Sequence, residues 1–360
     1  MAEARKKLFD SKRILITGGT GSLGKVLLRR LLSDDAGKPA QIVVFSRDEA
    51  KQHQIRVEYQ HRYAATDEVI YQNFRERLSF RIGDVRDYAS VSAALHGVDI
   101  VFNAAALKQV PTCEYFPYEA VQTNIVGAEN IVRAIRDLKL PVETVVGIST
   151  DKAVKPVNVM GMTKSIQERI LSCGNLAVPN TRFIMVRYGN VLASRGSVIP
   201  LFHEQIRNGG PVTITHPDMT RFLLSLDEAV DLIFTAVRKA RRGETFIPRV
   251  PSARMVDVAS ALIAGRPIDI NVTGIRPGEK LHEILVSEEE SQRTVANDGV
   301  YVIGPILPEL QQYEMIGPFL KKEYSSEFDV MTPDQVIKLM IRRKLMVDEK
   351  QVEIEGEFLR

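Results

Sequence analysis

The chain has 360 residues, of which 44% are hydrophobic and 26% charged, and its formal net charge is +3. This composition is typical of a globular protein long enough for two lobes, and it excludes a low-complexity chain. The small net charge and the lack of a basic stripe interleaved with aromatic residues argue against nucleic-acid binding.

A glycine-rich turn separates the first predicted strand from the first predicted helix. Residues 13–17 form a short apolar run typical of a buried strand, and residues 25–32 have the apolar spacing of a helix. Between them, residues 18–24 place glycines in a GxxGxxG pattern. Glycines let the backbone turn tightly and approach a ligand closely, and the helix N-terminus then faces a pyrophosphate. The pattern predicts a dinucleotide-binding unit with contacts from Thr17, Gly18, Thr20, Gly21, Ser22, Leu23 and Gly24.

The tip of the second predicted strand bears on which dinucleotide binds. Residues 41–45 form an apolar run that leads into Ser46 and Arg47. An acidic residue here would bind an adenosine ribose, whereas an arginine can bind a 2′-phosphate. We therefore predict NADP rather than NAD, with contacts from Ser46, Arg47 and Lys51, although a merely solvated arginine would also fit.

Two more strands follow before the middle of the chain. Residues 49–77 are rich in helix formers, and residues 78–84 and 98–103 are predicted strands. We expect Asp84, beside Val85, to reach the adenine ring; the alternative for Asp84 is a helix N-cap. Small residues after the fourth strand let the backbone lie against a cofactor, and a lysine follows them. These further candidate contacts are Ala104, Ala105, Ala106 and Lys108.

The alternation of helices and strands continues through the middle of the chain. A helix is predicted from about 118 to 140, a fifth strand over 142–148 and a sixth over 183–186. Such alternation predicts an α/β fold, a Rossmann-like doubly wound parallel sheet that binds ligands at the carboxyl ends of its strands. The fifth strand leads into the sequence Ser-Thr-Asp-Lys at 149–152, and Met-Gly-Met-Thr-Lys follows at 160–164.

Six motifs together resemble the extended short-chain dehydrogenase/reductases. More narrowly, they are similar to those of the soluble UDP-N-acetylglucosamine 4,6-dehydratases of bacterial surface-polysaccharide pathways. The resemblance covers roughly Lys12 to Glu290. Its carriers are residues 17–24 (TGGTGSLG), 45–49 (FSRDE), 104–111 (AAALKQVP), 149–153 (STDKA), 187–191 (RYGNV) and 276–281 (RPGEKL).

The resemblance implies a reaction in which NADP takes a hydride from C4 of a sugar nucleotide and returns it to C6. By the same resemblance, Asp151 is the acid at C6, Lys152 the base at C5, and Thr150 a hydrogen-bonding partner of the 4-oxygen. Lys164 is implied to bind the nicotinamide ribose. Both the acid and the base need surroundings that shift their pKa values. The face of C5 to which the proton returns is left open.

Met160 departs from the expected pattern, because a tyrosine four residues before Lys164 would make removal of the 4-hydroxyl proton easy. Three interpretations follow. The enzyme uses a water, Thr150 or Asp151 as the base; or it is an inactive member that only binds NADP; or a tyrosine elsewhere nearby in the sequence fills the role. Residues 152–180 contain no tyrosine, and some dehydratases of this group also carry methionine here, so we favour the first interpretation.

The second half of the chain is expected to bind the sugar nucleotide. The resemblance implies phosphate or ribose contacts from Asn190, Arg276 and Glu279. Further candidates are Lys108, Arg195 for a phosphate, and Thr213 in a short strand that could lie along a uracil. Arg195 could equally be a solvated loop arginine, and Glu279 could simply open a helix.

The motifs also predict how the chain divides. Residues 1–190, completed by 222–250, are expected to form the NADP-binding domain. A sugar-nucleotide lobe is expected from residues 191–221 and 251–330. Residues 331–360 are expected to be a tail with one helix, 333–345, which Thr332 opens as N-cap.

The cysteines and histidines indicate neither a disulfide framework nor a metal site. Cys113 and Cys173 lie far apart, and the six histidines show no metal-ligand spacing. The opening residues 1–9 are unlike a signal peptide, and no apolar run approaches the ~20 residues that a membrane span needs. We expect a cytoplasmic protein with no membrane span.

The preferred hypothesis is an NADP-dependent UDP-N-acetylglucosamine 4,6-dehydratase that forms a homo-oligomer, as the family's dimer-forming helix pair implies. Three alternatives stay open at this point. The nucleotide could be GDP, because no residue fixes the base. The reaction could be a 4-epimerisation, although the Asp151–Lys152 pair is what elimination needs. The chain could also be a non-catalytic NADP-binding protein, which Met160 alone supports.

Overall fold

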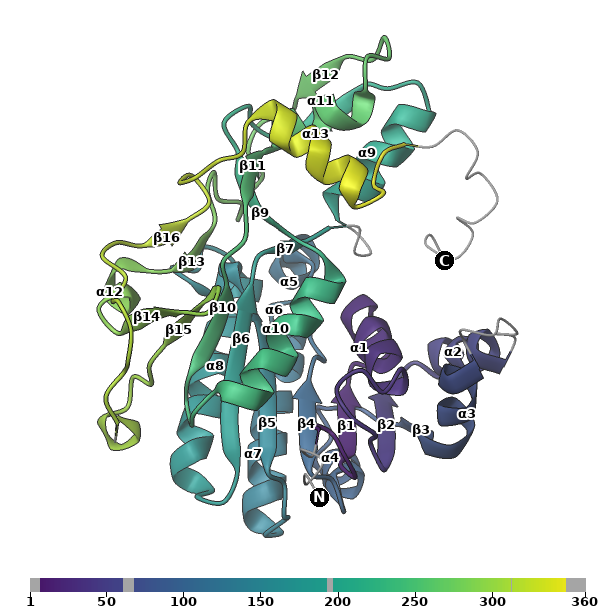
Figure 1. The fold of residues 1–360 in the computed structure, drawn as a ribbon, viewed down its shortest axis with the longest axis vertical. Helices are drawn as coiled ribbons and strands as arrows, with labels where there is room; N and C mark the ends of the chain where they lie inside the picture. Colours follow the sequence, from purple (N-terminus) through teal and green to yellow (C-terminus); the bar gives the residue numbers. More distant parts are fainter. Residues whose placement is uncertain (1–6, 61–67, 193–196, 312, 348–360) are drawn as a thin grey trace, which may run out of the picture.

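The computed structural model describes residues 7–60, 68–192, 197–311 and 313–347. Figure 1 shows a large body built on one sheet with helices on both faces, and a smaller lobe beyond the carboxyl ends of the strands. The large body contains the elements predicted for a doubly wound fold, and that prediction is confirmed.

A nine-stranded sheet forms the middle layer, in the order β14-β15-β10-β6-β5-β4-β1-β2-β3. The strands from β10 to β3 are parallel, whereas β15 pairs antiparallel with β10 at one edge and β14 pairs antiparallel with β15. The chain winds outward from β1 in both directions, so a topological switch point lies between β1 and β4. The bounds are β1 Arg13–Thr17, β2 Gln41–Ser46, β3 Leu78–Ile82, β4 Ile100–Asn103, β5 Thr144–Thr150, β6 Arg182–Tyr188, β10 Thr245–Pro248, β14 Thr294–Asn297 and β15 Val300–Ile303.

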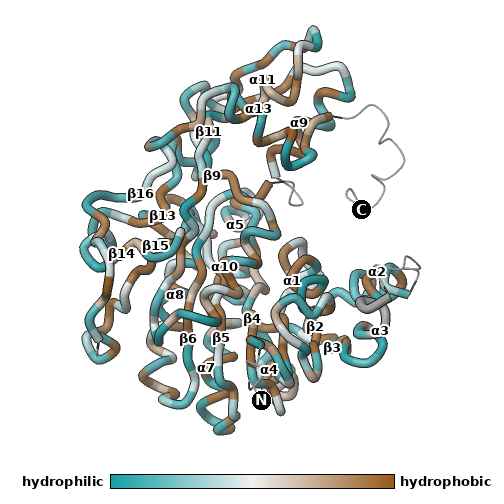
Figure 2. Tube along the Cα trace, viewed as in Figure 1, coloured by the Kyte–Doolittle hydropathy of each residue, from teal (hydrophilic) through white to brown (hydrophobic). Residues whose placement is uncertain are grey.

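Helices cover both faces of this sheet. One face carries α1 (Ser22–Leu32), α2 (Glu49–Gln60), α3 (Glu68–Arg77) and α10 (Leu226–Lys239), and the other carries α4 (Tyr88–Leu95), α7 (Gly127–Asp137) and α8 (Val159–Ala177). Successive strand residues point to opposite faces, so Ile14 and Ile16 join one core and Leu15 the other. Burial on both faces explains why the strands are continuous apolar runs, and Figure 2 shows hydrophobic stretches through the central strands.

The predicted helix over 118–140 is interrupted. The structure has α6 (Pro117–Ala120), a π-helical turn at Val121–Val126 and then α7. Asn124 lies in the wide turn, where its amide accepts from the Leu107 N–H (2.8 Å) and donates to the Leu107 carbonyl (3.0 Å) and to the Thr163 hydroxyl (3.0 Å). A π-helical turn is wider than an α-helical turn, and here it directs the Asn124 side chain into the protein interior. There Asn124 fixes the loop after β4.

The smaller lobe has its own apolar core. It contains α9 (Val198–Arg207), β8 (Val212–Ile214), α11 (Met255–Ile263), β12 (Ile270–Val272) and α13 (Pro333–Arg342). Thr332 caps α13 as predicted, in a capping box with Gln335, although the helix ends at Arg342 rather than at 345. Because α13 packs on α11, the helix expected in the tail lies within this lobe.

Three short strand pairs connect the lobe to the large body. They are formed by β7 (Asn190–Val191), β9 (Thr220–Leu224) and β11 (Ser252–Arg254), and by β13 (Ile284–Val286) with β16 (Tyr324–Ser325). Residues 294–303, which fall in the range expected for the substrate lobe, instead extend the main sheet as β14 and β15. The chain therefore crosses between the two parts several times.

The packing of α13 predicts a clear effect of mutation. Met340 is 0% exposed in the core of the lobe, whereas the adjacent Ile341 is 58% exposed. We expect Met340→Ala to lower the free energy of unfolding by about 2–4 kcal/mol, because it leaves a cavity. Urea unfolding followed by circular dichroism measures this change. The matched variant Ile341→Ala should change stability by less than about 0.5 kcal/mol; equal effects would contradict the placement of α13.

Candidate functional site

A cavity of about 590 Å³ lies at the carboxyl ends of β1, β2, β4, β5 and β6. Most of the residues predicted from the sequence line it, although they come from segments far apart in the chain. Those that line it are Gly18, Thr20, Gly21, Ser22, Leu23, Gly24, Ser46, Arg47, Lys51, Asp84, Val85, Ala104, Ala105, Ala106, Lys108, Thr150, Lys152, Met160, Lys164 and Asn190.

The glycine turn between β1 and α1 is built for close backbone contact. Gly18 has φ +65°, and a Cβ there would lie 2.8 Å from Ala105 Cα. At Gly24 a Cβ would lie 2.5 Å from Gly19 Cα, so any side chain at position 24 would prevent the first turn of α1 from packing on the glycine turn. Thr17 does not line the cavity; its hydroxyl donates to Asn103 Oδ1 (2.9 Å) and accepts from the Ala105 N–H (3.2 Å). Thr17 thus holds the 104–106 loop in place.

Charged residues gather at the tips of β2 and β3. Arg47 Nη1 lies 3.6 Å from Asp84 Oδ2, and Arg86 donates to the same carboxylate at 2.7 Å. Burial raises the pKa of Asp84, but the hydrogen bonds from Arg86 and the charges of Arg86 and Arg47 lower it by more. The pKa of Asp84 is therefore below its usual value. The helix-cap alternative for Asp84 is wrong, because Asp87 caps α4 by accepting from two backbone N–H groups. Strand β3 ends at Ile82, so Asp84 lies in the loop beyond it.

The end of β5 brings an acid and an amine together. Asp151 is 0% exposed, and its Oδ1 accepts from the Thr150 hydroxyl (2.7 Å) and from Lys152 Nζ (3.2 Å). Its Oδ2 has no hydrogen-bond partner among the described residues. Thr150 and Lys152 line the cavity but Asp151 does not, so Asp151 reaches the cavity through the Thr150 hydroxyl.

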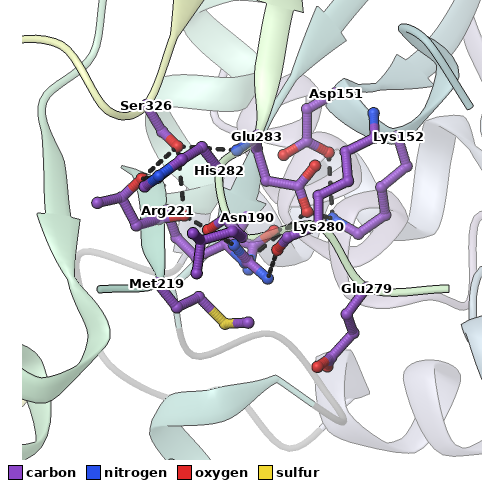
Figure 3. Close-up of polar contacts among 12 residues, drawn as sticks. Asp151, Lys152, Asn190, Met219, Arg221, Glu279, Lys280, His282, Glu283 and Ser326 are labelled. Carbon is purple, nitrogen blue, oxygen red and sulfur yellow. Dashed lines mark hydrogen bonds and ion pairs between the residues drawn. The ribbon is translucent and has the colours of Figure 1, made fainter. Parts of the chain in front are cut away.

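Lys152 belongs to a polar cluster (Figure 3). Its Nζ is 3.1 Å from Asn190 Oδ1 and 3.3 Å from Glu283 Oε1, in addition to its contact with Asp151. Burial lowers the pKa of Lys152, but the two neighbouring carboxylates outweigh burial and raise it. The cluster therefore holds a charged ammonium at the wall of the cavity in this structure.

Lys164 and Met160 lie one above the other on α8, four residues apart. Lys164 Nζ donates to the Ile148 carbonyl (2.5 Å) and to Gln167 Oε1 (2.7 Å). Burial lowers the pKa of Lys164 to about 8. Met160 packs against Cys113 and Ala120. No group able to accept a proton therefore stands at position 160.

The predicted substrate contacts divide into two sets. Lys108 and Asn190 line the cavity, whereas Thr213, Arg276 and Glu279 do not. Thr213 accepts from Gln205 within the small lobe, Arg276 is exposed, and Glu279 accepts from the Arg276 N–H (3.2 Å). Figure 3 shows Glu279 pointing away from Asp151 and Lys152. Arg195 lies outside the described residues. The roles predicted for these side chains stay predictions.

Two buried charged residues at the site, Glu283 and Arg221, were not predicted from the sequence. Glu283 and Arg221 are 2% and 6% exposed, and Arg221 Nε lies 3.7 Å from Glu283 Oε1. Glu283 comes two residues after the motif at 276–281, so its position in the sequence was a usable signal. Its contact with Lys152 spans more than 100 residues of chain, and no local pattern reveals such a contact.

A second buried ion-pair cluster holds the ends of β5 and β6 together. Arg187 pairs with Glu168 (2.7 Å) and Glu290 (2.8 Å), and the Ser149 hydroxyl donates to Glu168 (2.5 Å). Arg187 opens the motif at 187–191, yet it serves this cluster rather than the cavity.

The described part of the chain brings no three His, Cys, Asp or Glu side chains together in a way that could hold a metal ion. Nor does any helix in it have the length and apolar character needed to cross a membrane.

The lowered pKa of Lys164 predicts a dependence of stability on pH. Between about pH 8 and the unfolded pKa of ~10.4, the unfolded chain binds one proton more at this lysine than the folded chain, so stability rises with pH. We expect the free energy of unfolding of the wild type to rise relative to Lys164→Met by about 1 kcal/mol per pH unit across this window. Urea unfolding of both proteins at several pH values tests this. A difference that is independent of pH would contradict it.

Comparisons with known proteins agree with this architecture. Residues 14–305 match the family described as "Polysaccharide biosynthesis protein". A protein of Rickettsia typhi named UDP-glucose 4-epimerase is 44% identical over 301 residues, which cover 82% of this chain and 84% of that relative.

Solved structures give the same result. The X-ray structure of Pen from Bacillus thuringiensis matches with a TM-score of 0.82 and 33% identity, covering 94% of this chain and 99% of that one. DesIV, a dTDP-glucose 4,6-dehydratase from Streptomyces venezuelae solved with NAD and TYD bound, shares the fold with a TM-score of 0.63 at 20% identity, over 75% of this chain and 86% of that one. The resemblance found in the motifs is confirmed: the chain belongs to the polysaccharide biosynthesis protein family, among the nucleotide-sugar dehydratases and epimerases of the extended short-chain dehydrogenase/reductases.

Proposed function

We propose that this enzyme is an NADP-dependent 4,6-dehydratase that acts on UDP-N-acetylglucosamine and releases a UDP-4-keto-6-deoxy sugar. The observation that carries the proposal is the pairing of Asp151 with Lys152 at the end of β5, beside the cavity. Elimination across C5 and C6 needs an acid and a base on the same substrate, and these two side chains are adjacent.

The residues around the glycine turn fit a dinucleotide. Gly18 and Gly24 leave no room for a Cβ, so the turn must present bare backbone, while a Cβ at Gly21 would meet only the Gly18 carbonyl, at 3.3 Å. When bound, NADP would take the hydride from C4 and return it to C6. Arg47 and Lys51 are the cations at the β2 tip that favour the additional phosphate of NADP. Lys164, on α8, is a buried cation that lines the same cavity.

The Thr150–Asp151 hydrogen bond offers a base for the 4-hydroxyl that does not involve residue 160. Because Thr150 donates its own proton to Asp151, its oxygen is left to accept one from the substrate. A proton arriving at Thr150 can pass to Asp151 as the 4-oxygen becomes a carbonyl. This relay accounts for activity in a chain that carries Met160 where a tyrosine is expected.

The same proton then serves the elimination. Asp151, once protonated, returns it through Thr150 to the departing 6-oxygen, which leaves as water. Lys152 removes the C5 proton in this step and gives a proton back to C5 when the hydride reaches C6. Each residue thus ends the cycle in its starting protonation state, and no net oxidation occurs.

A 4-epimerase is the second candidate, because several relatives carry the name UDP-glucose 4-epimerase. Epimerisation removes a hydride from C4 and returns it to the opposite face of C4, so it needs neither an acid at C6 nor a base at C5. Epimerisation would therefore not use the Lys152 amine or the carboxylates of Asp151 and Glu283 beside it. Dehydration uses both groups, and we therefore favour it.

Replacement of Asp151 tests the proposal directly. Asp151→Asn keeps the shape of the side chain but cannot carry the proton, so we expect dehydration to fall by at least ~100-fold. Purified protein is incubated with UDP- and GDP-N-acetylglucosamine, and products are analysed by mass and by sugar chromatography. Loss of one water from the UDP sugar supports the proposal.

Other outcomes of that incubation would overturn it. A product of unchanged mass would identify an epimerase, dehydration of the GDP sugar alone would change the substrate, and no reaction with either would leave a binding protein. The exposed variant Asp298→Asn, which loses only an ion pair with Lys239, is the control and should retain activity.

The choice of cofactor is tested at Arg47. We expect Arg47→Ala to weaken NADP binding by about tenfold, the loss of roughly one charge-assisted hydrogen bond, and to leave NAD binding unchanged. Calorimetric titration with both dinucleotides measures this. The control Arg56→Ala removes an arginine that lies over the Phe80 ring instead. Equal affinity of the wild type for NAD and NADP would contradict a role for Arg47 at a 2′-phosphate.

A further inference from the structure

Glu283 is held against the reacting centre by a segment of the chain that leaves the small lobe. Asn158 Nδ2 donates to the Gly278 carbonyl (2.7 Å), and Lys280 donates to the Val154 carbonyl. The Glu283 N–H donates to the Ser326 hydroxyl (2.9 Å), just before β13 begins. These contacts leave the Glu283 side chain 2% exposed, with its carboxylate directed at Lys152 (Figure 3).

The charges around Lys152 come from three segments of the fold. Asp151 lies on the same turn, 3.2 Å away, and Glu283 comes from the segment just before β13, 3.3 Å away. Arg221 on β9 approaches Glu283 at 3.7 Å and otherwise donates to the carbonyls of Thr220, Lys280 and Leu281. Lys280 adds a second positive charge nearby. One amine thus stands between two buried carboxylates, and each has an oxygen without a partner among the described residues.

This arrangement creates a chemical difficulty for a lysine that must act as a base. Only the neutral amine can remove the C5 proton, but two anionic neighbours favour the ammonium. The ammonium must therefore pass its proton on before it can act. Asp151 already accepts from Thr150, through which it exchanges protons with the cavity. Glu283 does not line the cavity, and the cations within 4 Å of its carboxylate among the described residues are Lys152, at 3.3 Å, and Arg221, at 3.7 Å.

We propose that Glu283 is a positioning residue that accepts the proton of the Lys152 ammonium and thereby supplies the neutral amine that acts at C5. Its Oε2 has no hydrogen-bond donor among the described residues, and Oε1 lies 3.3 Å from the ammonium. This inference rests on the proposed dehydration, and it assigns a task to a residue outside the recognised motif.

The proton balance of this step is closed. The N–H bond of the Lys152 ammonium breaks and an O–H bond forms on Glu283, so an ion pair becomes a neutral pair with the same total number of protons. Lys152 then takes the C5 proton and later returns one to C5. Glu283 gives its proton back to the amine at the end of the cycle. No proton needs to be exchanged with water.

A flat dependence on pH is the signature of such an internal transfer. In the wild type, the active neutral pair and the resting ion pair hold the same protons, so the elimination rate should not change across the neutral range. In Glu283→Gln the ammonium must lose its proton to solvent. We therefore expect the elimination rate of that variant to rise about tenfold per pH unit and to be at least ~10-fold below the wild type near pH 7.

The experiment follows single turnovers of the NADP-loaded enzyme with UDP-N-acetylglucosamine at several pH values. Absorbance of the reduced nicotinamide reports hydride removal from C4, and mass analysis of quenched samples reports loss of water. Glu283→Gln should still form reduced cofactor at the wild-type rate and then stall before elimination. Glu323→Gln removes a carboxylate from an exposed ion pair with Lys155 and should behave as the wild type in both readouts.

The remaining outcomes separate the two proposals. If the wild type forms neither reduced cofactor nor dehydrated product, the proposed function fails. If it dehydrates but Glu283→Gln has the same flat profile, or if the wild-type profile already rises with pH, the role of Glu283 is wrong. Should Glu283→Gln not fold, Glu283→Asp serves instead: a slower but flat profile supports the transfer, and a rising profile overturns it.

Discussion

The buried contact between Lys152 and the carboxylates of Asp151 and Glu283 is the interaction on which the rest of this structure depends. Asp151 and Glu283 are 0% and 2% exposed, and buried charges of this kind are tolerated only when they are paired. The pairing joins the tip of β5 to a segment that comes from the small lobe, and Arg221 on β9 completes it. Because these groups come from separate parts of the fold, the cluster forms only when the two parts are packed together.

Backbone geometry imposes the second constraint, at the opposite end of the cavity. Gly18 and the loop after β4 touch so closely that no side chain could separate them. Thr17 and Asn124 fix that loop from two sides, one from the end of β1 and the other from the π-helical turn before α7. The cavity wall is therefore rigid where a cofactor would lie, while the charged cluster forms the opposite side.

Met160 stands where a tyrosine was expected to accept the 4-hydroxyl proton, so in the proposed mechanism other residues accept it. A methionine there seals the wall against Cys113 and Ala120 and carries no proton. The hydroxyl of Thr150 stands at the cavity and is hydrogen-bonded to a buried carboxylate. In the proposed mechanism one proton moves between substrate and Asp151, and a second stays within the Lys152–Glu283 pair. The two transfers do not compete, because they use different carboxylates.

By itself the sequence determined the Rossmann-like sheet, the glycine turn, the strands that carry the cavity residues and the Asp151–Lys152 pair. These features are local, because strand and helix periodicity and glycine spacing are properties of short segments. Tertiary structure alone decided that Glu283 and Arg221 reach Lys152, that Asn124 turns inward through a π-helical turn and that α13 belongs to the small lobe. It also separated Thr213, Arg276 and Glu279 from the cavity. Those outcomes depend on how distant segments pack and on which buried charges must find a partner, and no local pattern records either.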